Sequence, residues 1–167
     1  VDLKAYIDAA QASPDAEVLC GGYDDSKGWF VYPTIIQALK KEYPTMVEEL
    51  FGPVLTIYVY EDAELDAMLH YCNTSTSYAL TGAIFAQDRA SIVYMEEMLR
   101  HSAGNFYIND KPTGAVVGQQ PFGGSRGSGT NDKAGSPLNL YRWTSVCAVK
   151  ECFEPTPEIL YPYMTEQ

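Results

Sequence analysis

Apolar positions at helical spacing open the chain. They are Leu3, Tyr6, Ile7 and Ala10. Asp2 stands immediately before them and is a residue type that caps helix N-termini, while Ser13-Pro14 interrupts the pattern. We therefore expect a first helix that begins after Asp2 and ends at Ser13.

Two apolar stretches follow this helix. Their pattern predicts a short strand over residues 17–20, a turn at Gly21-Gly22, and a second strand within residues 29–36. Pro33 interrupts the second stretch and has no N–H group with which to join a ladder. We therefore expect the second strand at the edge of its sheet.

The middle of the chain alternates between strand-like and helical patterns. Strands are predicted over residues 54–60, 82–86 and 104–108. Between them lie two helical stripes, Leu65, Met68, Leu69 and Cys72 in the first and Ile92, Met95 and Leu99 in the second. Such alternation is typical of parallel strands with right-handed crossovers, so the predicted fold class is α/β with a parallel βαβαβ core.

Periodicity stops over residues 109–135, and residues 114–135 contain seven of the chain's thirteen glycines. Glycine adopts positive φ and lets backbone N–H groups approach a ligand, which suits an anion. The spacing Gly124-x-x-Gly127-x-Gly129 is not a dinucleotide fingerprint, because that motif follows a strand and opens a helix. From the residues alone, a ligand-binding loop and a flexible connection have equal weight.

Composition narrows the classes of partner. The chain has 167 residues, of which 46% are hydrophobic and 20% charged, so neither disorder nor a membrane span is expected. Its net charge of −11 repels phosphate backbones and anionic lipid surfaces. We therefore expect neither nucleic acid nor a membrane as a partner.

The cysteines and histidines give little support to thiol or metal chemistry. No C-x-x-C spacing occurs among the four cysteines, Cys20, Cys72, Cys147 and Cys152, which fits a reducing compartment. Only His70 and His101 could join them as metal ligands. No cysteine has the context that lowers a thiol pKa, and Cys72 is expected to be buried. Both histidines are expected in the last turns of helices. We assign no catalytic residue and no metal ligand.

An acidic pair precedes the predicted strand over residues 54–60, within Glu48-Glu49-Leu50-Phe51-Gly52-Pro53. By itself this pair is more often a solvent-exposed turn than a site. Its position beside a strand end, where ligands bind in open α/β sheets, adds weight to a binding role.

Two motifs give the chain a resemblance to a known family. Glu48-Glu49-Leu50-Phe51-Gly52-Pro53-Val54 and Pro121-Phe122-Gly123-Gly124 resemble motifs of the aldehyde dehydrogenases. Residues 104–120, together with 128–133 and 142–145, are similar to the Δ1-pyrroline-5-carboxylate dehydrogenases, one branch of that family. The resemblance runs from about Val1 to Glu151.

The resemblance implies an activity and a set of binding residues. The activity is the oxidation of glutamate 5-semialdehyde to glutamate in proline catabolism, with NAD as the hydride acceptor. By motif position, Glu49 would contact the ribose hydroxyls next to the nicotinamide, and Phe51 would pack beside the nicotinamide. Gly114 and Ala115 would offer N–H groups to the substrate carboxylate, with Phe122 against its aliphatic part.

One departure from the family pattern matters for activity. The family's nucleophilic cysteine stands in a Gly-Gln-x-Cys context, and none of the four cysteines has that context. The family's NAD-binding domain and oxyanion-hole asparagine also lie upstream of the matched region. Since the first residue is Val1 rather than Met, we expect the C-terminal part of a longer enzyme, inactive by itself, with apolar surface exposed beside residues 54–60.

We divide the expected piece into two parts. Residues 1–143 would belong to the catalytic domain, and residues 144–167 would form a C-terminal strand and extended arm of the kind that joins subunits, giving a homodimer or a higher homo-oligomer. The bacterial cytoplasm and the mitochondrial matrix both suit its cysteines.

Two alternatives stay open. One is a non-catalytic module that keeps the carboxylate-binding loop or the dimer surface. The other is an aldehyde dehydrogenase for another substrate, against which residues 109–120 argue.

Overall fold

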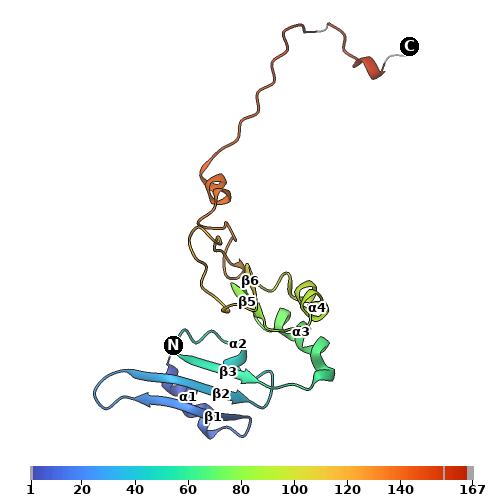
Figure 1. The fold of residues 1–167 in the computed structure, drawn as a ribbon. Coiled ribbons are helices and arrows are strands. Elements are labelled where there is room, and N and C mark those ends of the chain that lie inside the picture. The colour runs from blue at the N-terminus through green and yellow to red at the C-terminus, as the bar shows by residue number, and fades with distance from the viewer. Residues whose placement is uncertain (1, 156, 165–167) are drawn as a thin grey trace.

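Residues 2–155 and 157–164 are described by the computed structural model, in which three small sheets and their helices form a body from which the C-terminal segment extends (Figure 1). None of the helices in these ranges is both long and apolar enough to cross a membrane.

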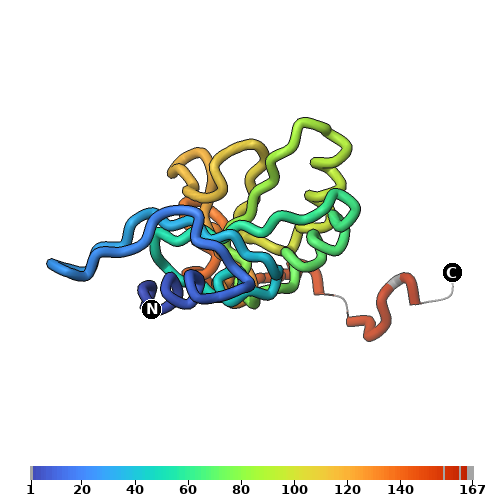
Figure 2. The backbone as a smooth tube through the Cα atoms, turned by 90° about the horizontal axis from the view of Figure 1, so that it is seen from below, coloured from blue at the N-terminus to red at the C-terminus, as the bar shows by residue number. Residues whose placement is uncertain are grey.

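Helix α1 (Leu3–Ala12) forms where its sequence pattern predicts it. The Asp2 carboxylate caps it by accepting a hydrogen bond of 3.2 Å from the Ala5 N–H, and Ser13 is its C-cap. The helix lies along one face of the first sheet (Figure 2). There Ala10 packs in a buried cluster with Ala16 and Ile36.

The first sheet has the strand order β1 (Ala16–Asp24), β2 (Phe30–Ala38), β3 (Val54–Tyr58). Strand β1 is antiparallel to β2, and β2 is parallel to β3. The turn expected at Gly21-Gly22 is wrong, because both glycines lie within β1. They have φ of +95° and +125° where the register with β2 shifts, so their positive φ allows the irregular pairing of the two strands at this point.

The expectation that β2 lies at an edge is also wrong, since it is the central strand. Pro33 is tolerated there because it lies in the same irregular stretch, where Cys20 pairs with Ile35 and Gly22 with Tyr32. On the other side, pairing with β3 begins only at Thr34. No regular ladder bond therefore requires an N–H group at Pro33.

The second half of the body contains a parallel βαβ unit, β5 (Thr81–Ile84), α4 (Arg89–Leu99) and β6 (Asn105–Ile108). Helix α3 (Leu65–Thr74) packs against α4, and its Leu69 shares a buried core with Ile84, Ile92 and Leu99. Hydrogen bonds from Ser91 cap α4 at Asp88 and lower the pKa of that carboxyl. These units confirm the α/β class.

The βαβαβ order does not form one continuous sheet, because β3 pairs with β2 and not with β5. Strand β4 (Tyr78–Ala79) instead pairs with β7 (Ser125–Arg126), within the glycine-rich region. Each has two residues, which is too short for an alternating pattern, so neither was expected. The remaining short helices are α2 (Pro44–Val47), η1 (Asp62–Glu64), η2 (Pro137–Trp143) and η3 (Pro162–Met164).

The segment after η2 pairs with no other described strand, so residues 144–153 do not form the strand that the sequence predicts. It runs away from the body as an extended arm (Figure 1). Its large apolar side chains, Val146, Val149 and Phe153, are exposed. A strand is defined by its partner, and this segment meets none within the described ranges.

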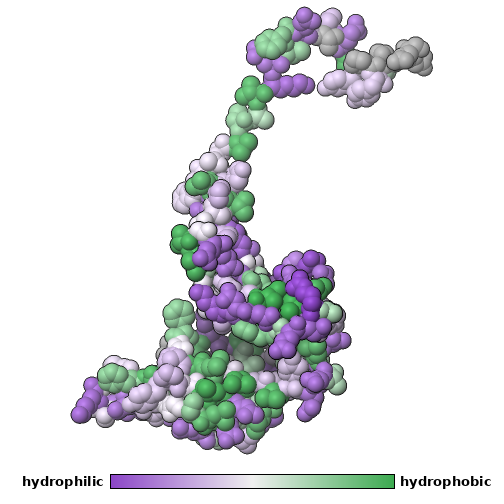
Figure 3. Space-filling view, viewed as in Figure 1, coloured by the Kyte–Doolittle hydropathy of each residue, from purple (hydrophilic) through white to green (hydrophobic). Residues whose placement is uncertain are grey.

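One face of the first sheet is apolar and uncovered. Successive strand residues point to opposite faces, so Val54 faces the buried cluster under α1 whereas Leu55 and Ile57 point the other way. Leu55 is 58% exposed, and Val59 beyond the strand is 67% exposed. Figure 3 shows apolar side chains gathered over this lower part of the body. This is the exposed apolar surface expected beside residues 54–60.

The buried cluster under α1 gives a stability prediction. Ile36 is fully buried, so Ile36→Ala leaves a cavity and should lower the free energy of unfolding by about 2–5 kcal/mol, measured by urea denaturation. Val149→Ala, on the exposed arm, is the control and should change it by less than about 0.5 kcal/mol. Equal losses in the two variants would contradict the assignment of Ile36 to the core.

Candidate functional site

The first part of the candidate site is the turn between α2 and β3. Leu50 is buried and holds the turn against the body. A Cβ at Gly52 would lie 2.3 Å from Cδ1 of Leu3, so glycine lets the turn pack on α1. The Tyr6 hydroxyl donates a hydrogen bond to the Glu48 carboxylate, which raises the pKa of Tyr6. The two acidic residues therefore differ, because Glu48 accepts a hydrogen bond from Tyr6.

Phe51 stands out within this turn. Its φ is +53°, a conformation that a bulky residue rarely adopts, and its ring is 90% exposed. Both features are unfavourable for the chain by itself, and residues held in this way cluster at ligand clamps. The Phe51 ring is consequently open to stacking or packing against a planar group.

Glu49 has the free carboxylate of the pair. It is exposed, and it neither pairs with a cation nor accepts a hydrogen bond within residues 2–155 and 157–164. A carboxylate in this state can accept hydrogen bonds from hydroxyl groups of a ligand.

The second part of the site is the glycine-rich loop that follows β6. Asn105, at the start of β6, is buried and uses both ends of its amide on this loop: its Nδ2 donates to the Pro121 carbonyl at 2.8 Å, and its Oδ1 accepts from the Gly123 N–H at 3.1 Å. Backbone bonds of 2.9 and 2.8 Å also join Phe122 to Ala134. The loop is thus fastened around Phe122.

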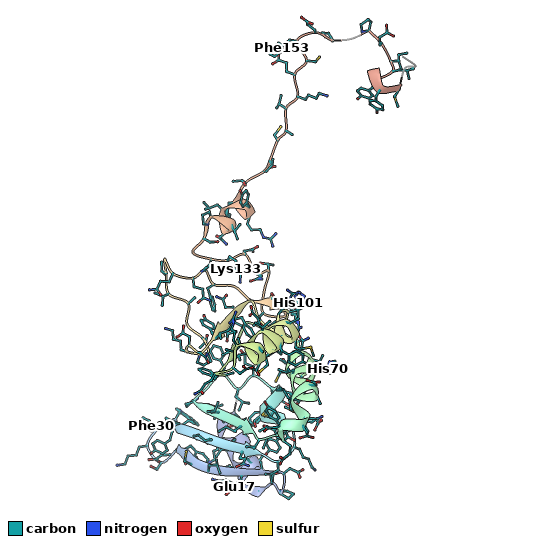
Figure 4. All side chains as sticks on the ribbon, turned by 45° about the vertical axis from the view of Figure 1, so that its right-hand side comes forward. Glu17, Phe30, His70, His101, Lys133 and Phe153 are labelled. Carbon is teal, nitrogen blue, oxygen red and sulfur yellow. The ribbon has the colours of Figure 1, made fainter. Side chains whose placement is uncertain are left out.

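A close approach of two backbones makes this fastening possible. A Cβ at Gly104 would lie 2.0 Å from the Gly123 carbonyl oxygen, so no other residue type fits without displacing the loop. The Lys133 ammonium donates to the Gly104 carbonyl and lies 3.4 Å from Asn105 Oδ1. Desolvation lowers the pKa of Lys133. Figure 4 shows Lys133 on the loop above α4.

The outer part of the loop carries the predicted carboxylate donors. Gly114 has φ of +99°, and the hydrogen bonds within residues 110–120 are local turns, such as those from Gln119 and Gln120 to the Val116 carbonyl. The N–H groups of Gly114 and Ala115 donate to no acceptor in the described part of the chain. They are available to an anion.

The structure brings Gly114, Ala115 and Phe122 onto one loop, whereas Glu49 and Phe51 lie on the separate turn before β3. No hydrogen bond between described residues joins the two groups. Asn105 and Lys133 were not predicted as site residues, because their role rests on contacts between segments 16 to 29 residues apart. Their only signal was that they lie in the stretches similar to one family branch.

Two further buried polar atoms lie in this region. Among the described residues, the Tyr107 hydroxyl and Asn131 Oδ1 are the buried side-chain polar atoms that have no hydrogen-bond partner. Tyr107 lies two residues beyond Asn105 on the same face of β6, and Asn131 Oδ1 would lie 3.1 Å from a Cβ at Gly123. Unpaired buried polar atoms are rare; Tyr107 lies on the strand before the glycine-rich loop, and Asn131 lies within the loop.

The cysteines and histidines behave partly as expected. Cys72 is exposed, so the expectation that it is buried is wrong, but desolvation of its sulfur still raises the pKa of its thiol, opposite to what a nucleophile needs. His70 lies on α3 before its last turn, and His101 lies beyond the end of α4, so neither is in the last turn predicted for it (Figure 4). Within the described ranges, no cluster of three or more His, Cys, Asp or Glu side chains could hold a metal ion.

Comparison with known proteins gives consistent similarities. The model of the "Aldehyde dehydrogenase family" matches residues 2–149. The mitochondrial delta-1-pyrroline-5-carboxylate dehydrogenase of Dictyostelium discoideum is 58% identical over 166 residues, and the match covers 99% of this chain and 30% of that protein. The mitochondrial delta-1-pyrroline-5-carboxylate dehydrogenase of Bos taurus is 52% identical over 163 residues, and the match covers 97% of this chain and 29% of that protein. The chain therefore spans about three tenths of the length of these curated relatives.

A solved structure agrees with these relatives. The crystal structure of the delta-pyrroline-5-carboxylate dehydrogenase from Mycobacterium tuberculosis bound with NAD is similar to this chain with a TM-score of 0.73 at 49% identity. The match covers 96% of this chain and 29% of that one.

The contact between Gly104 and Gly123 gives a prediction for the loop. Gly104→Ala forces β6 and the loop apart, so we expect a loss of about 1–3 kcal/mol in the free energy of unfolding and faster hydrogen exchange at the Gly123 amide, measured by NMR. Gly118→Ala is the control, because a Cβ there meets no atom within 4 Å and adds only the strain of φ +84°. Equal exchange at Gly123 in both variants would show that the contact does not hold the loop.

Proposed function

Because the chain belongs to the aldehyde dehydrogenase family, we propose that it is the C-terminal part of an NAD-dependent Δ1-pyrroline-5-carboxylate dehydrogenase that oxidises glutamate 5-semialdehyde to glutamate. This reaction belongs to proline catabolism. The substrate is a small molecule with a carboxylate at the end opposite the aldehyde.

One observation supports this substrate above others: two adjacent N–H groups, at Gly114 and Ala115, are unused on a loop that is fastened on its far side. Two such donors can hold a carboxylate in a fixed orientation. Phe122, on the same loop and partly exposed, would pack on the aliphatic part of the substrate. The loop thereby fixes the distance from the anchored carboxylate to the reacting aldehyde.

The turn before β3 fits an NAD nicotinamide riboside. When bound, NAD supplies the hydride acceptor. The unpaired Glu49 carboxylate would accept hydrogen bonds from the ribose hydroxyls, and the exposed Phe51 ring would pack beside the nicotinamide. The strained φ at Phe51 is consistent with a residue held in position for a ligand.

We further propose that the nucleophilic cysteine and the main NAD-binding domain belong to other parts of a longer polypeptide. In support, none of the four cysteines follows Gly-Gln-x, and the relatives are about three times as long as this chain. The uncovered apolar face with Leu55 and Val59 is also what an internal surface of a larger protein looks like.

The extended arm suggests assembly of subunits. Residues 144–153 present unpaired backbone and exposed apolar side chains, which a strand from a second copy could cover. We therefore propose that the whole enzyme is a homodimer or a higher homo-oligomer. A non-catalytic carboxylate-binding module is the second candidate function, because the loop with Gly114 and Ala115 is complete within this chain.

The proposed division of the site between segments can be tested by activity. The purified 167-residue chain should reduce no NAD in the presence of glutamate 5-semialdehyde, whereas the longer polypeptide should do so, followed by absorbance of NADH at saturating substrate. Turnover by the 167-residue chain would overturn the division of the site between segments. A parent gene without an upstream Gly-Gln-x-Cys motif would favour the non-catalytic module.

The proposed carboxylate donors can be tested by substitution. Gly114→Pro removes one N–H donor, so the longer enzyme should show a rise of about tenfold or more in KM for the semialdehyde and little change in KM for NAD. Gly118→Pro is the matched control, since it lies on the same loop with a similar positive φ but is not a proposed donor. Equal KM values for the two variants would refute the donor role of Gly114.

A further inference from the structure

The amide of Asn105 holds the glycine-rich loop on both sides of Phe122. Its residue is only 3% exposed, and its Oδ1 and Nδ2 atoms hold Gly123 and Pro121, the residues on either side of Phe122. The same Oδ1 lies 3.4 Å from Lys133 Nζ, near the distal end of the loop. One buried side chain therefore fixes both flanks of Phe122 and contacts the returning chain.

Lys133 completes this arrangement without an acidic partner. Its ammonium donates to the Gly104 carbonyl, and it pairs with no carboxylate in the described ranges. The neighbouring Asp132 instead pairs with Arg142 at 2.7 Å. Lys133 also has φ of +55°, which is rare for a lysine. A partly desolvated cation held only by backbone and amide oxygens costs stability, so a purely structural role explains it poorly.

We propose that Asn105 and Lys133 form a clasp that positions Phe122 and the Gly114–Ala115 donors, and thereby sets the selectivity of the enzyme for a carboxylate-bearing aldehyde. This rests on the proposed function. Both are positioning residues, because they act through the loop and touch the loop backbone rather than the substrate.

The path from the clasp to the substrate is short. Phe122 lies between the two clasped residues, and its backbone pairs with Ala134, the residue after Lys133. Within the described ranges, residues 110–120 make only local hydrogen bonds, so their placement depends on the two anchors that flank them. These are Asn109, whose side chain bonds the Ala86 backbone, and residues 121–123. Loss of the Lys133 ammonium would remove its bonds to the Gly104 carbonyl and Asn105 Oδ1, which hold one side of the loop, and would leave α3, α4 and the buried core intact.

The clasp can be tested first by hydrogen exchange in the longer enzyme. Lys133→Met should speed hydrogen exchange at the Gly123 amide by about tenfold, because its acceptor Asn105 Oδ1 loses the neighbouring ammonium. Lys27→Met, at an exposed lysine on the β1–β2 hairpin, removes the same charge and should leave that exchange unchanged. Unchanged exchange in Lys133→Met would overturn the clasp.

The kinetic test uses the longer enzyme. Lys133→Met should raise KM for glutamate 5-semialdehyde about tenfold, with kcat and KM for NAD within about twofold. Its effect on kcat/KM for butanal, which can still contact Phe122 but lacks the carboxylate, should be smaller, within about twofold. Lys133→Arg keeps a cationic donor and should recover most of the loss. A general loss of folding would instead lower activity on both aldehydes by the same factor.

The outcomes separate the two proposals. If the wild-type enzyme oxidises butanal but not the semialdehyde, the proposed function fails. If it oxidises the semialdehyde and Lys133→Met changes KM for the semialdehyde and kcat/KM for butanal by the same factor, the function stands and the clasp is refuted. Asn105→Asp is a second variant, which keeps the acceptor for Gly123 and loses the donor to Pro121, and should raise the same KM.

Discussion

The contact between two glycine backbones, at Gly104 and Gly123, is the constraint on which the rest of the candidate substrate site depends. Because no side chain separates these backbones, the start of β6 reaches the loop directly, and the short Asn105 amide can span to the carbonyl and the N–H on either side of Phe122. The loop needs no regular secondary structure of its own. Hydrogen bonds hold it where it contacts β6, whereas residues 110–120, which carry its free N–H groups, make no tertiary hydrogen bond within the described ranges.

The elements that the sequence predicts well are those with a regular pattern of apolar residues. Helix α1 and the β5–α4–β6 unit have an apolar stripe or run that marks their buried side, so periodicity locates them. Pro33 predicted an edge position for β2, and this was wrong. The proline is tolerated in a central strand because the register between β1 and β2 shifts beside it, which no local pattern encodes. The arm at residues 144–153 has strand-like residues, but a ladder requires a second strand that these ranges do not supply.

The candidate site is predictable only in part, for a similar reason. The glycine content of residues 114–135 signals a loop with unusual backbone conformations. The stretches that resemble the aldehyde dehydrogenases point to Glu49, Phe51, Gly114, Ala115 and Phe122, whose roles stay predictions. Asn105 and Lys133 carry no such signal. An asparagine in a strand and a lysine in a loop are ordinary residues until the fold places them 3.4 Å apart, across 28 positions of sequence.

The extended arm has a consequence for handling the protein in solution. Unpaired backbone with β-branched and apolar side chains, such as Val146 and Val149, offers a template that other chains can extend into intermolecular sheets. Lys150 and Glu151 interrupt the apolar run and act as gatekeepers against such stacking. With Cys147 and Cys152 exposed on the same arm, chains that meet there can also become cross-linked by oxidation, so reductant and low protein concentration keep the chain dispersed.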